Sequence, residues 1–158
     1  MTAAPELVEF RPDGAGAVVQ AMAAMHVAHE GWINVQPAVN DDDLPAPGSP
    51  LFGIFSGSGP AVPLITWAPG EKRRRGFGPT TVGVQHGSGS KAADRLRESG
   101  RALPEEWVVL QDHPKRGLVA AVPPDADDAA VLAWLIDAAT VLSRVPFTGT
   151  WRAAIYRP

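Results

Sequence analysis

Apolar residues recur at helical spacing in an early stretch of the chain. Across residues 15–29, Val18, Met22 and Met25 follow one another at intervals of three or four positions. That interval places them on one face of a helix, and Gly31 stands where such a helix would stop. We therefore expect a helix over residues 15–29 that packs against a core.

A longer apolar stripe predicts a second helix near the C-terminus. Pro123 and Pro124 stop any preceding strand, and Asp125 can cap the helix that follows. The stripe ends at Arg144, ahead of Pro146. Its residues recur every three or four positions and are Val131, Trp134, Leu135, Ala138, Val141 and Leu142.

Most of the remaining apolar residues form short β-prone runs separated by turn residues. Expected strands cover 51–55, 63–67, 80–85, 107–112, 118–122 and 150–156, with shorter extended segments at 7–10 and 32–35. A third helix is expected from Ser90, which can cap it, to Gly100. Because hairpins outnumber crossovers, we expect an α+β fold with a mostly antiparallel sheet of about five to six strands and three helices packed on it.

The length and composition are those of a single globular domain. We assign all 158 residues to it, with flexible loops at 37–50 and 68–79. The 14 basic and 17 acidic residues give a net charge of −3, which disfavours a nucleic-acid partner. There is no cysteine, basic leader or membrane-length apolar run, so we expect a cytoplasmic protein without a membrane partner.

The segment from Thr80 to Ser99 combines a strand, a glycine loop and a helix start. Free N–H groups at a helix start carry partial positive charge and attract anions. The segment therefore predicts a phosphate-binding loop. A chain reversal with a purely structural role would have the same sequence pattern. The candidate ligand-binding residues are Gly87, Ser88, Gly89, Ser90, Lys91, Asp112 and His113.

Two resemblances extend the ligand interpretation. Gly87, Gly89 and Ala92 fit G-x-G-x-x-A, which resembles the dinucleotide-binding fingerprint. Asp112 lies twenty residues past Ala92, where that fingerprint places the acid that binds ribose, but a hairpin follows it instead of a helical crossover. The loop is also similar to the CoA-binding turn of GNAT-type acetyltransferases, from whose spacing it departs by one residue. These resemblances imply an enzyme that binds phosphate, a nucleotide or CoA, with Lys91 as an electrostatic clamp.

A pair of histidines raises the question of a metal site. His26 and His29 lie three positions apart on one helix face and would need a third ligand, for which Asp41–Asp43 are the nearest candidates. Their spacing matches no zinc-peptidase motif. We therefore assign no metal site.

A charge relay is a further possibility for Asp112 and His113, with Ser88 or Ser90 as the nucleophile. Neighbouring residues on a strand point to opposite faces, and the chain has no G-x-S-x-G elbow. We therefore assign no catalytic residue and expect Asp112 and His113 to begin a turn.

A local basic run beside Phe77 offers a surface for acidic partners, although such a run is usually just a solvated loop. The acids Asp41–Asp43 are candidates to pair with it. Trp32, next to the acidic loop, is expected to line a pocket. The residues of the run are Lys72, Arg73, Arg74 and Arg75.

The order of the expected elements over residues 15–144 is helix, three strands, helix, two strands and helix, which resembles the type III secretion chaperone-like fold. The resemblance implies a protein-binding module, often a homodimer, whose sheet or helical face receives a partner segment. The strand at 150–156 departs from that pattern. Because the sequence shows no convergent set of acid, base and nucleophile, we expect a non-catalytic cytosolic domain that binds a protein or small ligand. The alternative is a phosphate-, nucleotide- or CoA-binding enzyme that uses Gly87–Lys91, and the sequence names no cofactor.

Overall fold

The computed structural model describes residues 3–44 and 59–158. Its helices are α1 (Gly16–Ala28), α2 (Ala92–Glu98) and α3 (Asp128–Leu142), and its short 3₁₀ turns are η1 (Pro12–Gly14) and η2 (Asp41–Asp43). Its strands are β1 (Glu6–Phe10), β2 (Trp32–Pro37), β3 (Leu64–Ala68), β4 (Thr80–Gln85), β5 (Val108–His113), β6 (Gly117–Val122) and β7 (Trp151–Tyr156). The α+β class is confirmed, whereas the expected strand at 51–55 lies outside the described residues.

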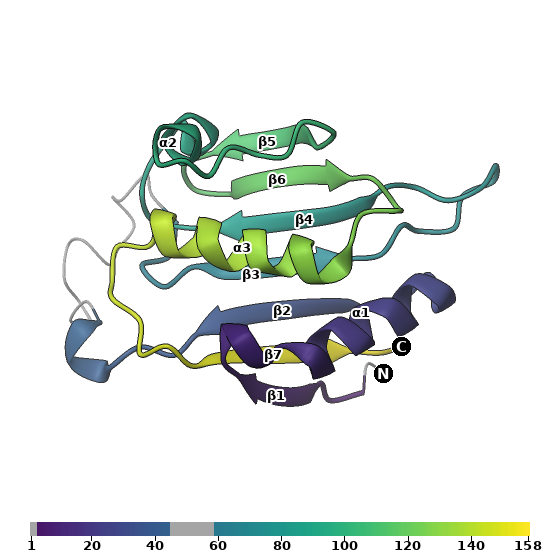
Figure 1. The fold of residues 1–158 in the computed structure, drawn as a ribbon, viewed down its shortest axis with the longest axis horizontal. Helices are drawn as coiled ribbons and strands as arrows, with labels where there is room; N and C mark the ends of the chain where they lie inside the picture. Colours follow the sequence, from purple (N-terminus) through teal and green to yellow (C-terminus); the bar gives the residue numbers. More distant parts are fainter. Residues whose placement is uncertain (1–2, 45–58) are drawn as a thin grey trace.

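The strands form one antiparallel sheet in the order β1-β7-β2-β3-β4-β6-β5 (Figure 1). Within the described residues it has seven strands, more than the five to six expected. The difference comes from β1 and β2, which pair with β7 along their whole length. Because β7 supplies hydrogen-bond partners from the far end of the chain, it stabilises two segments whose own strand patterns are short.

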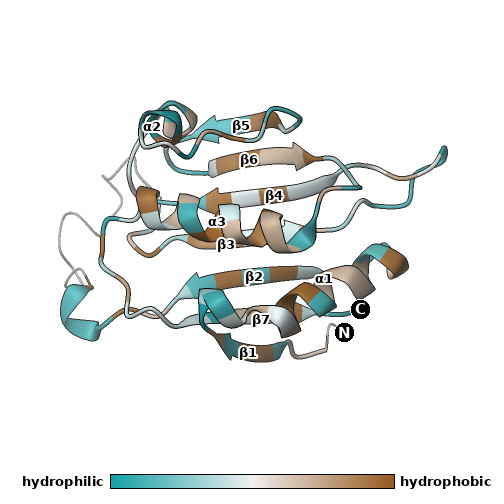
Figure 2. Cartoon of the chain, viewed as in Figure 1, coloured by the Kyte–Doolittle hydropathy of each residue, from teal (hydrophilic) through white to brown (hydrophobic). Residues whose placement is uncertain are grey.

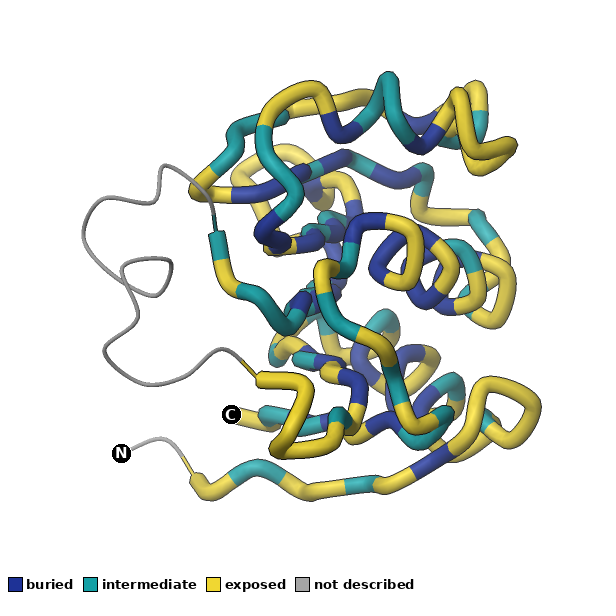
Figure 3. The backbone as a smooth tube through the Cα atoms, turned by 90° about the vertical axis from the view of Figure 1, so that its left-hand side faces the viewer, coloured by how far each residue is buried: buried dark blue, intermediate teal, exposed yellow. Residues whose placement is uncertain are grey.

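All three helices cover the same face of the sheet (Figures 1 and 3). α3 packs on β3 and β4, α2 packs on β5, and α1 packs beside α3. Strands β2, β3, β4, β6 and β7 bury every second residue beneath this helical layer. Each buried aliphatic side chain contributes roughly 1.5–3 kcal/mol to folding, and Ile33, Ile65 and Leu135 are among them. None of the helices in the described part of the chain has the length and apolar character to cross a bilayer.

The first helix ends earlier than its glycine suggests. His29 occupies the C-cap position with φ 56, and its backbone N–H donates to the carbonyl of Met25 at 2.7 Å. A non-glycine residue in this left-handed region is uncommon. Gly31, the expected stop, has φ +90 and leads into β2 instead.

The ends of α3 also differ from expectation. The side chain of Asp127, not that of Asp125, caps the helix by accepting the backbone N–H of Ala130 at 2.9 Å. The helix stops at Leu142, and Val141 is 38% exposed although it belongs to the predicted stripe. The stripe is offset because residues on both of its sides are buried between the sheet and the neighbouring helices. The buried set is Val131, Leu132, Leu135, Ile136, Ala138, Ala139 and Leu142.

Candidate functional site

The loop between β4 and α2 brings most of the predicted ligand-binding residues together. α2 begins at Ala92, and Lys91 occupies its N-cap position with φ 60 and no side-chain cap, so the expected cap from Ser90 was wrong. The cap comes from β5, because the carboxylate of Asp112 accepts the backbone N–H groups of Ala92 and Ala93 at 3.1 and 3.0 Å. A negative charge therefore already lies at the positive end of α2.

The same loop is held from inside by His86 and Arg95. His86 is fully buried, and its Nδ1 accepts the backbone N–H of Ser88 at 3.3 Å and the hydroxyl of Ser88 at 2.8 Å. The guanidinium of Arg95, on α2, donates to the carbonyls of Ser88 and Gly89. Backbone N–H and carbonyl groups of the loop are thus both hydrogen-bonded to side chains of the fold.

The environment of His86 keeps its ring neutral. Burial lowers the pKa of His86, the positive charge of Arg95 lowers it further, and Asp112 offsets part of the effect. Because Nδ1 accepts hydrogen bonds, the proton of the neutral ring resides on Nε2. That nitrogen is buried and has no hydrogen-bond partner among the described residues.

We expect the free energy of unfolding to fall as the pH drops below 6.5, the ordinary pKa of histidine. In that range unfolded His86 takes up a proton, whereas folded His86 resists protonation because its pKa is lowered. Urea unfolding on both sides of this pH, followed by tryptophan fluorescence, measures the effect. His86→Asn keeps an acceptor near the Nδ1 position and should flatten the pH dependence. His113→Asn should retain it because His86 remains, and equal slopes in wild type and His86→Asn would contradict the prediction.

These contacts favour a structural chain reversal over a phosphate loop. Gly87, Gly89 and Ala92 keep the spacing of the dinucleotide fingerprint. However, the acid of the pattern, Asp112, binds the helix start, where the pyrophosphate would lie. An incoming phosphate would have to displace this carboxylate against like-charge repulsion. Lys91 is exposed at the same point.

The residues suggested for a charge relay are engaged separately. Asp112 caps α2, while Nδ1 of His113 accepts two backbone N–H groups of the following turn, each at 3.1 Å. The hydroxyl of Ser88 is bound to His86. A turn follows at residues 114–116 as expected, although Asp112 and His113 belong to the end of β5 and not to the turn itself. Within the described residues no hydrogen bond joins Asp112, His113 and Ser88 to one another.

His26, on α1, and His29, at the C-cap of α1, have different partners. Nε2 of His26 lies 2.8 Å from a carboxylate oxygen of Asp128, and its ring meets Trp67 edge to face with centroids 5.0 Å apart. His29 stacks on Phe77 with centroids 3.6 Å apart and an interplanar angle of 7°. Across residues 3–44 and 59–158, no three metal-binding side chains converge.

The basic run forms the tip of the hairpin that joins β3 to β4. Lys72 pairs with Phe77 across this hairpin, and the stacking of Phe77 on His29 attaches it to the end of α1. η2, which contains Asp41–Asp43, lies at the opposite end of the molecule (Figures 1 and 2). The suggested pairing of these acids with the basic run is therefore absent within the described chain. All four cations, Lys72, Arg73, Arg74 and Arg75, are exposed.

The face of the sheet opposite the helices carries a row of side chains that we call the cross-sheet row. Residues paired directly across antiparallel strands share a face. On every strand of the row except β5, its member alternates with a residue buried under the helices. The rings of Trp32 and Tyr156 stack at one end of the row, with centroids 4.8 Å apart. Trp32 and Ala68 are joined indirectly, because they lie next to the paired residues Ile33 and Trp67, whereas the other neighbours in the row are paired directly. The row runs over strands β7, β2, β3, β4, β6 and β5 through Tyr156, Trp32, Ala68, Thr81, Ala121 and Val108.

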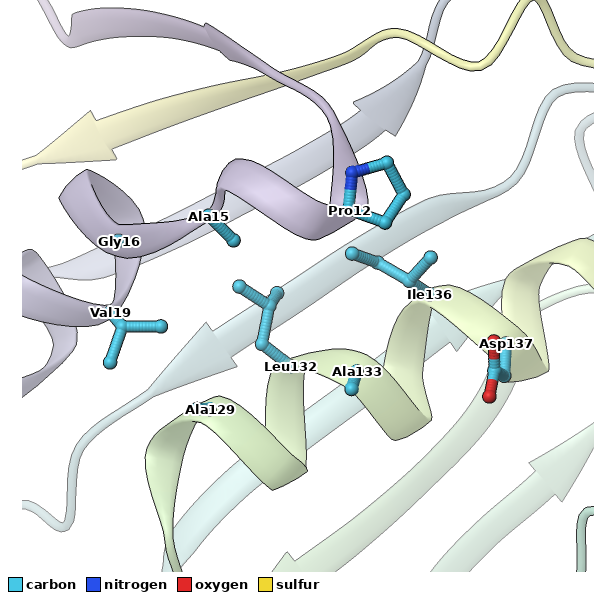
Figure 4. A pocket seen from close by; sticks show the side chains of 9 residues that line it. All are labelled: Pro12, Ala15, Gly16, Val19, Ala129, Leu132, Ala133, Ile136 and Asp137. Carbon is cyan, nitrogen blue, oxygen red and sulfur yellow. The ribbon is translucent and has the colours of Figure 1, made fainter.

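A hollow of about 340 Å³ lies on the other side of the molecule, between α1 and α3 (Figure 4). Its walls are aliphatic and include Val19, Leu132 and Ile136, with the carboxylate of Asp137 at its edge. Trp32, which the sequence suggested as a pocket residue, is not among the lining residues. It is 39% exposed on the face of the sheet that carries no described helix, which we call the helix-free face.

No family model, curated protein or solved structure matches the chain. The similarity of element order to the type III secretion chaperone-like fold therefore stays a prediction. Sequence reasoning did not single out Arg95, the buried role of His86, or the exposure of β5. Arg95 could have been noticed as a cation one turn into a short helix, but its acceptors become apparent only when the loop is folded back on it.

Proposed function

We propose that this protein is a non-catalytic binding domain that receives a protein partner on the helix-free face of its sheet. The observation that carries the proposal is the cross-sheet row. Neighbouring strands lie about 4.8 Å apart, so a row across six strands is roughly 24 Å long. A surface of that length suits a polypeptide better than a small ligand.

The shape of the row also supports a polypeptide partner. Both ends of the row are accessible: beside Tyr156 at one end Trp32 is 39% exposed, and at the other end Val108 is 59% exposed. Its middle consists of the small residues Ala68, Thr81 and Ala121. Small central side chains let a partner approach the sheet closely, while the aromatic end supplies apolar contact area.

The polar candidates give the enzyme alternative less support. Asp112, His113 and Ser88 each bind a different part of the fold, and the start of α2 already holds a carboxylate. Binding through apolar side chains needs none of these groups. The geometry therefore favours a binding function over phosphate, nucleotide or CoA chemistry at Gly87–Lys91.

Thr81→Arg is expected to weaken binding of a protein partner at least about tenfold, or 1.4 kcal/mol. The long cation fits between its small neighbours Ala68 and Ala121 without disturbing the core, but it places an unpaired charge in the middle of the contact. The partner would be captured with the wild-type chain, identified and purified, and its dissociation constant measured by calorimetry. Val27→Arg is the control, because Val27 is 85% exposed on α1.

Equal affinities of the partner for wild type and Thr81→Arg would contradict binding at the helix-free face.

A thermal-shift screen against CoA, NAD, NADP and nucleotides tests the enzyme alternative. A ligand at one hundred times its dissociation constant stabilises the folded protein by about 2.7 kcal/mol. We expect no shift. A shift that disappears in Lys91→Ala would contradict the proposed function and support an enzyme that uses the glycine loop.

A further inference from the structure

The strand β5 is an unusually apolar sheet edge. It stands last in the strand order, so its outer backbone groups have no strand partner in the described part of the chain. Three consecutive apolar residues are exposed on it: Val108 by 59%, Val109 by 44% and Leu110 by 56%. An exposed apolar edge is a template on which another strand can pair.

The opposite edge of the sheet is protected by charge. On β1, Glu9 pairs with Arg152 at 3.1 Å and Glu6 pairs with Arg157. Charged side chains along an edge discourage further strand pairing. The two edges of one sheet therefore differ, and β5 is the one suited to association.

The charges that flank β5 are self-complementary. Glu105 and Glu106 precede the strand, Lys115 and Arg116 follow it, and all four are exposed. In an antiparallel pair of identical strands, the start of each strand lies opposite the end of the other. A pair centred on Leu110 would set Glu105 of each copy opposite Lys115 of the other.

We infer that two copies of this chain associate through antiparallel pairing of their β5 edges. Such a contact is symmetric, because the same patch is used on both copies. Backbone hydrogen bonds would hold the strands together, the apolar run would be removed from water, and the acidic and basic ends would fix the register. The inference does not rest on the proposed function. Pairing would cover Val108, the β5 end of the cross-sheet row, and would leave the rest of the row, from Tyr156 to Ala121, open.

A β-bulge limits how the two edges can meet. The register between β5 and β6 shifts between Val109 and Gln111, so Leu110 is the extra residue. A bulge bends the strand and increases its local twist. Regular pairing would therefore run on either side of Leu110, with the bulges of both copies near the symmetry axis. The flanking charges then contribute more to fixing the register, because they lie outside the bulged segment.

A charge-exchange experiment tests the pairing through the oligomeric state, measured by sedimentation velocity. We expect the wild-type chain to form a dimer. The variant Glu105→Lys/Glu106→Lys has only positive flanks and the variant Lys115→Glu/Arg116→Glu only negative ones. Each alone should raise the dimer dissociation constant at least about tenfold through like-charge repulsion. An equimolar mixture of the two should restore the dimer, which also shows that both variants are folded.

A matched pair of edge variants locates the contact. Leu110→Lys, on β5, should abolish the dimer. Leu7→Lys, on the β1 edge, should leave it intact, although Leu7 is exposed to a similar degree, 60% against 56% for Leu110. A monomeric wild type, a mixture that stays monomeric, or a dimer broken by Leu7→Lys instead would each overturn the inference.

Discussion

Gly117→Ala should lower the free energy of unfolding by roughly 3 to 4 kcal/mol, the largest effect that we expect from a single methyl group here. Gly117 has φ +91, a conformation that strains any residue with a Cβ atom. A Cβ at this position would also lie 2.5 Å from the carbonyl oxygen of Val84 and 3.0 Å from Cα of Gln85. Both obstacles are backbone of β4, so β6 would have to move away from its neighbour in the sheet.

Gly100→Ala separates the two causes. Gly100 also has a positive φ, +76, but nothing lies within 4 Å of its added Cβ. It should therefore lose only the conformational part, about 1 kcal/mol. Urea unfolding curves of both variants measure the difference. Similar losses for the two would show that close contact with β4 contributes little at Gly117.

Asp112→Ala is expected to lower the free energy of unfolding by about 2 kcal/mol. The substitution leaves the backbone N–H groups of Ala92 and Ala93 without their acceptor and removes the negative charge from the positive end of α2. The substitution also removes both hydrogen bonds between the start of α2 and β5, on which the helix packs. Chemical denaturation gives the size of the effect, and hydrogen exchange of the α2 amides shows where it occurs.

Asp112→Asn should fall between Asp112→Ala and wild type, because its single side-chain oxygen can accept one of the two N–H groups but carries no charge. Asp94→Ala is the control, since Asp94 lies on the same helix in an exposed pair with Arg97 and should cost little. Asp112→Ala could instead have the same free energy of unfolding as wild type and the same affinity for phosphate. That result would show that the Asp112 carboxylate does not organise the start of α2.

Local patterns predicted those parts of the fold that depend on near neighbours in the sequence. The short β-prone run at 150–156 correctly predicted a strand, in which Trp151, Ala153 and Ile155 form the buried face. The apolar period correctly located α1 and α3, although their ends moved by a few residues. The caps were less predictable, because several acids near a helix start can serve and only the backbone turn selects one of them, as it selects Asp127 over Asp125.

The spacing of the sequence indicated that the glycine loop and Asp112 are neighbours, but not what Asp112 binds. The glycine loop and Asp112 do lie together, as the fingerprint spacing indicates. Their chemistry depends on orientation, because the same acid can bind a ribose or occupy the helix start in place of a phosphate. The direction of the Asp112 side chain follows from β5 lying beside α2, which no local pattern reports.

The amino-acid order alone established that this chain is an α+β protein built on antiparallel strands, because side-chain period and turn chemistry act over a few residues. Folding in three dimensions placed β7 between β1 and β2, put all the described helices on one face, and left β5 at an edge. Strand order and edge exposure depend on contacts between residues far apart along the chain. The free energy of such contacts belongs to the assembled sheet and not to any single strand.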